Sequence, residues 1–105
     1  MVLDFYARVH REGETTKYLR SIKGLTKYLM DFAEDVPLQV VIHSRKYFST
    51  ITVDFRPDAS PKWSVAEHLH DPLVVKKYNL PAASRLLFET DDRLVLLQFL
   101  NDFFR

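Results

Sequence analysis

The sequence has no cysteine and only two glycines among its 105 residues. Without cysteine there is no disulfide framework, thiolate zinc site or cysteine nucleophile. Two glycines leave no room for a glycine-rich phosphate-binding loop. Long apolar runs are missing too, because the longest, Leu94 to Leu97, has four residues and cannot form a transmembrane helix. These absences exclude several classes of enzyme and membrane protein.

The sequence also lacks a large excess of charge of either sign. Fifteen Lys and Arg stand against fourteen Asp and Glu, for a formal net charge of +1. A broadly basic coat for DNA and a strongly acidic DNA mimic are therefore both excluded. The chain is 47% hydrophobic and 28% charged, as in ordinary globular proteins, and we expect one domain over residues 1–105. No basic segment precedes an apolar run at the start, so we expect a protein of the cytoplasm or of the interior of a virus particle.

Hydrophobic periodicity predicts seven elements. Alternation predicts strands over 2–10, 38–43 and 50–55, the last two as a hairpin, and another short strand over 85–89. Apolar spacings of three and four predict a helix over 16–34. Capping patterns predict a broken helix over 64–70 and 72–78, and a last helix over 91–104.

The first six of these elements, taken in order, match the βαββαβ unit of ferredoxin-like folds, and the seventh is an added C-terminal helix. We therefore predict an α+β fold with a four-stranded antiparallel sheet. The 16–34 and 64–78 helices should lie on one face, and the 91–104 helix at an edge or on the other face.

The C-terminal helix is the most unusual stretch, because eight of the eleven residues from 94 to 104 are apolar. Packing on one sheet face requires only a narrower apolar stripe. The surplus is either buried within the domain or forms an interface, for which we select Leu97, Leu100, Phe103 and Phe104. We predict a small non-enzymatic protein-binding module, a homodimer, an inhibitor or an adaptor, that acts by occlusion or bridging. The stretch from Leu86 to Leu100 is similar to the ending of many small phage-encoded accessory proteins.

A basic helix face supports an alternative function, an RNA- or DNA-binding regulator. Four basic residues of the predicted 16–34 helix fall within an arc of about 120° at ~100° per residue. The turn after the second strand adds two more, and such residues could bind phosphates. A solvated face and an acidic protein partner stay open as readings of the same pattern. The residues are Lys17, Arg20, Lys23, Lys27, Arg45 and Lys46.

Three weaker patterns are also compatible with ordinary surface roles. Aromatic and polar residues of the first and third strands could stack RNA bases. Glu67 and His70 have the spacing of a metal-binding pair, but only one copy is present. His43 with Asp54 could form a general-base pair. We expect no metal and no cofactor. The strand residues in question are Tyr6, Arg8, His10, Phe48, Thr50 and Thr52.

Overall fold

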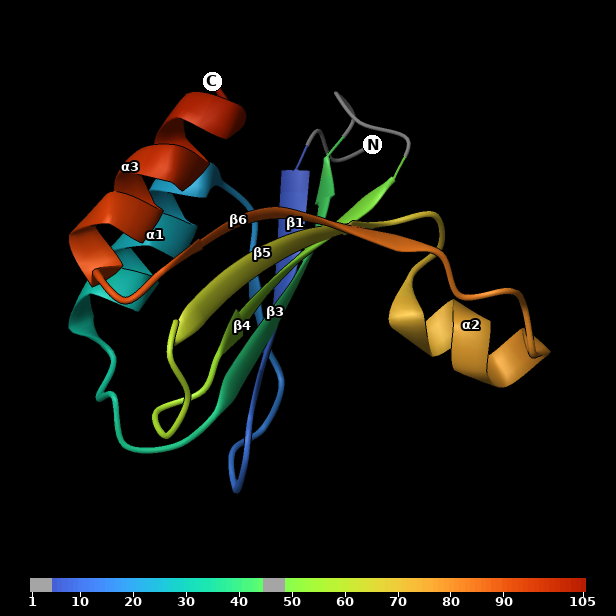
Figure 1. Cartoon of the computed structure of the whole chain (residues 1–105), viewed down its shortest axis with the longest axis horizontal. Coiled ribbons are helices and arrows are strands. Elements are labelled where there is room, and N and C mark those ends of the chain that lie inside the picture. Colours follow the sequence, from blue (N-terminus) through green and yellow to red (C-terminus); the bar gives the residue numbers. More distant parts are fainter. Residues whose placement is uncertain (1–4, 45–48) are drawn as a thin grey trace.

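The computed structural model describes residues 5–44 and 49–105, and the predicted α+β class is confirmed there (Figure 1). The described residues form six strands, joined in one antiparallel sheet, and three helices. In chain order the elements are β1 Phe5–Arg11, β2 Lys17–Leu19, α1 Ile22–Asp31, β3 Leu38–Ser44, β4 Thr50–Phe55, β5 Trp63–His68, α2 Pro72–Tyr78, β6 Ser84–Thr90 and α3 Arg93–Phe103.

The strand order differs from that of the predicted ferredoxin-like unit. The sheet runs β2-β1-β3-β4-β5-β6, and every neighbouring pair is antiparallel. A ferredoxin-like unit has two helical crossovers, each between parallel strands. Here α1 is such a crossover, because it joins β2 to β3, which are both antiparallel to β1 between them and so parallel to each other. The second helix, α2, instead joins β5 and β6, which are antiparallel neighbours.

Two predicted helical segments are strands. Residues 17–19 form β2, which pairs with Ala7 to Val9 of β1. The helix α1 starts only after Ser21, whose hydroxyl accepts a hydrogen bond from the amide of Gly24 at 3.0 Å. The segment predicted as helix 64–70 is β5, where Trp63 and Val65 are buried and their neighbours less so. The helix-capping pattern at Ser64 was misleading because the same residues also alternate with the period of a strand.

The core lies between one face of the sheet and the layer of α1 and α3. Leu25 and Leu29 of α1 and Leu96 and Leu100 of α3 are fully buried there against inward side chains of the strands. Aromatic packing closes one end, where Phe32 meets the ring of Trp63 edge-on at a centroid distance of 5.6 Å. The 91–104 helix therefore shares its face with α1, and α2 lies on the opposite side of the sheet (Figure 1).

The α2 helix is formed as its capping residues predict. The side chain of Asp71 accepts a hydrogen bond from the amide of Leu73, and Pro72 occupies the first turn. Asn79 ends the helix in the left-handed conformation at φ 52°.

Candidate functional site

The α1–α3 layer is joined at one end by Arg93. Its guanidinium donates to the carbonyl oxygens of Leu29, Met30 and Phe32 at 3.0, 2.9 and 3.1 Å. It also pairs with Glu34 at 2.5 Å. These carbonyls lie at the C-terminal end of α1 and have no partner within the helix. The guanidinium donates hydrogen bonds to them, and its positive charge interacts favourably with the negative end of the helix dipole. The first turn of α3 is thereby fixed beside the last turn of α1.

Large apolar side chains are exposed at this junction. Leu94 is 62% exposed, and Val95 and Met30 are also exposed. A groove of about 290 Å³ lies between the two helices, and Met30 is one of its lining residues. The residues lining the groove are Lys23, Thr26, Lys27, Met30, Asp31, Leu97 and Asn101.

The residues selected for the interface lie deeper than their neighbours. Leu97 is 5% exposed and forms part of the groove, and Leu100 is fully buried in the core. Phe103 and Phe104 are half-buried and pack against the core cluster, Phe104 edge-on to Phe5 at 5.4 Å. Apolar side chains cover more than half of this helix, so the sequence pattern alone does not single out the side that faces its own sheet.

The predicted basic residues come from different elements instead of one helix. Lys17 lies in β2, Arg20 precedes α1, and Lys23 and Lys27 lie on α1. Lys17 and Lys27 still line one cavity of about 550 Å³, in which the ammonium of Lys17 sits 5.1 Å from the ring centroid of Tyr28. Lys27 also lines the helix groove together with Lys23. Arg45, Lys46 and Phe48 lie outside the described residues.

A buried charge cluster lies on the opposite face of the sheet. Arg8 of β1 donates to both carboxylate oxygens of Asp71, at 2.8 and 2.9 Å, and His43 of β3 contacts the same carboxylate at 2.8 Å. The ring of Tyr6 stacks on that of His43 at 4.9 Å. Arg8 and Asp71 are 63 positions apart in the chain and both are 9% exposed. The cluster attaches the start of α2 to the middle of the sheet.

Hydrogen bonding dominates the electrostatics of this cluster. Burial alone would raise the pKa of Asp71, but hydrogen bonds from Arg8, the amide of Leu73 and His43 outweigh it and lower that pKa to about 2. The same bond to Asp71 raises the pKa of Arg8 above its ordinary value. Asp71 is therefore ionised over the whole physiological range, and α2 is attached by a full ion pair.

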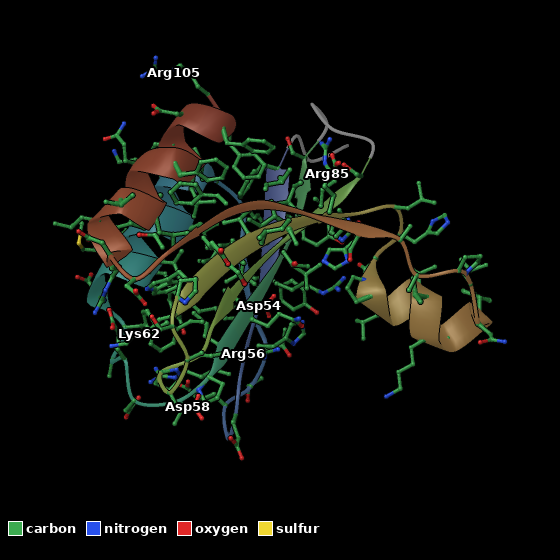
Figure 2. All side chains as sticks on the ribbon, viewed as in Figure 1. Asp54, Arg56, Asp58, Lys62, Arg85 and Arg105 are labelled. Atoms are coloured by element: carbon green, nitrogen blue, oxygen red, sulfur yellow. The ribbon has the colours of Figure 1, made fainter. Side chains whose placement is uncertain are left out.

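A second polar region occupies the other end of this face, where Figure 2 labels Asp54 and Arg56. His10, Gln39, Asp54 and Arg56 are among the residues lining a cavity of about 470 Å³ there. Burial lowers the pKa of His10, and the charge of Arg8 adds to that effect. Burial also raises the pKa of Asp54, although the hydrogen bond from Gln39 at 3.2 Å opposes the shift.

The weaker catalytic and metal patterns are not assembled. His43 contacts Asp71, whereas Asp54 contacts Gln39, so the two members of the predicted general-base pair have different partners. Glu67 accepts from Ser49 at 2.7 Å and from Arg85 at 3.0 Å, and Thr52 bonds His68 at 2.8 Å. In the described part of the chain no group of three His, Asp or Glu residues could hold a metal ion.

No family model, no curated protein and no solved structure matches the chain. In the ranges 5–44 and 49–105, none of the helices is long and apolar enough to cross a membrane.

Proposed function

We propose that the chain is a small non-enzymatic protein-binding module that acts by occluding or bridging a partner through the first turns of α3. The observation that carries this proposal is the exposure of Leu94, Val95 and Met30 on the layer of α1 and α3, where Met30 and Leu97 line a groove between the two helices. The core is already filled by other faces of the same helices. Apolar side chains grouped on a helix surface favour a protein contact.

The energetics suit an interface centred on these residues. Burying an exposed Leu or Val side chain contributes about 1.5–3 kcal/mol. A few such residues supply most of the affinity of a typical interface, provided that polar neighbours exclude water around them. The lysines of α1 and the amide of Asn101 border the groove and can form that rim. Arg93 holds the surface in one geometry, so little conformational entropy is lost on binding.

The first experiment measures molar mass by size-exclusion chromatography with light scattering, with absorbance at two wavelengths, on protein purified at low salt. We expect a dimer, or a complex with a host protein, free of nucleic acid. The double variant L94E/V95E should keep its fold and elute as a smaller species. A monomer that is unchanged by these substitutions and carries no host protein contradicts the proposal.

A nucleic-acid-binding regulator is the second candidate. Its support is that Lys17 of β2 and Lys27 of α1 reach one cavity from different elements. Binding of this kind weakens steeply with salt, because each neutralised phosphate releases counterions. Titration with a single-stranded RNA and a duplex DNA at 50 and 200 mM salt tests it. The double variant K17E/R20E, which leaves the groove beside Leu97 unchanged, should abolish binding in this case and should spare protein binding through Leu94.

A further inference from the structure

The connection between β5 and β6 is longer than the sheet requires. These strands are antiparallel neighbours, with His68 opposite Ser84, and the amide of Leu69 donates to the carbonyl of Ala83 at 3.0 Å. A hairpin connection of this kind usually needs about two to five residues. Here residues 69–83 leave the sheet and form α2. Long insertions of this kind in compact domains are typically functional.

The insertion contributes nothing to the core. None of the residues of α2 is buried, and Leu73 and Tyr78 are 55% and 62% exposed, with Val74 exposed beside them. An ordinary surface helix turns its apolar stripe toward its own protein. Folding of the domain therefore does not explain why α2 carries large apolar side chains.

The direction of α2 is nevertheless fixed by a buried contact. Asp71 is its N-cap, and the carboxylate accepts from Arg8, His43 and the amide of Leu73. Withdrawing an ion pair from water is costly, and a buried pair that loses one partner leaves an uncompensated charge, so the two partners hold each other in place. The chain thus holds a helix that buries nothing in a defined orientation, on the face opposite α1 and α3 (Figure 1).

The charges of α2 are all of one sign. From Pro72 to Ala83 the sequence contains no acidic residue, and its charged side chains are Lys76 and Lys77. Val74 and Tyr78 are four positions apart and share one side of the helix. The ammonium of Lys77 lies 5.3 Å from the ring centroid of Tyr78, so positive charge borders the apolar side chains directly. The complementary surface is apolar at its centre and acidic at its rim.

We propose that α2 is a second docking arm, which binds a partner protein through an apolar surface with an acidic rim. A second copy of the chain fits less well, because twofold contact between two α2 helices would bring like charges together at Lys76 and Lys77. A nucleic acid would attract the lysines but would offer no apolar surface to Leu73 and Val74. This surface is separate from the one in the proposed function, and either can fail alone.

The test is a titration of the full, uniformly ¹⁵N-labelled chain with two designed peptides, followed by amide chemical shifts. Both are short amphipathic helices with leucines on one side. One has glutamates beside the leucines and the other has lysines. We expect the glutamate peptide to shift the amides of 73–78 and the lysine peptide to leave them unchanged. The K76E/K77E variant should lose about tenfold or more in affinity, the effect of ~1.4 kcal/mol or more. The control R56E/K62E, in the connection between β4 and β5 and outside both proposed surfaces, should bind unchanged.

Several outcomes would contradict the proposal that α2 is a docking arm. The glutamate peptide could leave α2 unperturbed, or both peptides could shift it equally, which would indicate apolar adhesion without charge recognition. Shifts confined to α1 and α3 would assign the peptide to the other surface. Concentration-dependent shifts of α2 without peptide would indicate self-association, and shifts with a uridine oligonucleotide alone would indicate nucleic-acid binding. Because Lys76 and Lys77 are exposed, the K76E/K77E variant should fold normally, and its circular dichroism spectrum checks this.

Discussion

At the scale of single residues, Asp71 is the side chain that joins α2 to the sheet. It neutralises Arg8, orients His43 and caps α2 with one carboxylate. Removing it would leave the buried guanidinium of Arg8 without a counter-charge. Its loss should therefore affect both stability and the position of α2.

We expect Asp71→Ala to lower the free energy of unfolding by about 3–5 kcal/mol, the usual effect of leaving one partner of a buried ion pair. Urea denaturation at pH 7, followed by the fluorescence of the buried Trp63, measures it. Glu67→Ala is a matched control, since that carboxylate is part-exposed and pairs with the largely exposed Arg85. A loss below 1 kcal/mol for Asp71→Ala would mean that Arg8 rehydrates easily and that the anchor is weak.

The same carboxylate predicts a pH dependence. Its folded pKa of about 2 lies below the ordinary 3.8, so its contribution is present above pH 3.8 and is lost as the pH falls through 2. The shift corresponds to about 2 kcal/mol. The stability difference between the native chain and Asp71→Asn should accordingly shrink between pH 5 and pH 2. A constant difference over that range would contradict the ion pair.

Asp54 should behave in the opposite sense. Burial raises its pKa, so the charged form is less favourable in the folded state than in the unfolded chain. Asp54→Asn keeps an oxygen that can accept from Gln39 and removes the charge. We expect a higher urea midpoint than that of the native chain at pH 7, and no advantage below pH 3.8, where the native carboxyl is protonated in both states. A lower midpoint at pH 7 would indicate that Arg56 needs the charge.

At the scale of elements, Arg93 joins α3 to the end of α1 with three hydrogen bonds to carbonyl oxygens. Arg93→Ala should lower the free energy of unfolding by about 2–3 kcal/mol, because bonds to a charged donor contribute more than neutral ones and part-buried acceptors are left unpaired. Arg93→Lys should recover only part of this, since an ammonium lacks the planar fork. Arg85→Ala, a change at a largely exposed arginine, should cost little. Equal effects at both arginines would contradict this role.

The elements also show what the sequence could predict. Strands β1, β3 and β4 follow from alternation, and α2 follows from Asp71, Pro72 and Asn79, because these signals are local. β5 was mistaken for a helix because Ser64 and Glu67 imitate a capping box within an alternating segment. The Arg8–Asp71 contact joins positions that are 63 residues apart, so no local sequence pattern predicts it. Which side of α3 stays exposed was harder to predict, because Leu94 also falls on the side that carries Gln98 and Asn101.

At the scale of the whole molecule, the sheet separates two apolar surfaces, Leu94 and Val95 on the helix layer and Leu73, Val74 and Tyr78 on α2. Both edges of the sheet are poor places for strand addition. β2 has only three residues and carries a lysine, and a bulge interrupts the pairing of β6 with β5. Recognition by helices is thus favoured over recognition by strand pairing, and two opposite surfaces suit a bridging protein.

Neither surface should be needed for folding. Exposed positions outside cores and networks usually tolerate substitution within about 0.5 kcal/mol. We therefore expect L94E/V95E and K76E/K77E, alone and combined, to unfold near the native temperature in a calorimetric scan. A large fall for either pair would show that its side chains support the fold, and would remove that surface from consideration as an interface.

Protein contact through the first turns of α3 is best tested by photo-crosslinking. A photoreactive amino acid is placed at Val95 of the full chain, and a control chain carries it at Asp58, an exposed loop position far from α3 (Figure 2). We predict one defined cross-linked product from Val95, either the dimer or a complex with one other protein, and none from Asp58. The product should disappear when Leu94→Glu is added. Equal labelling from both positions, or none from Val95, would contradict a protein-binding role for this surface.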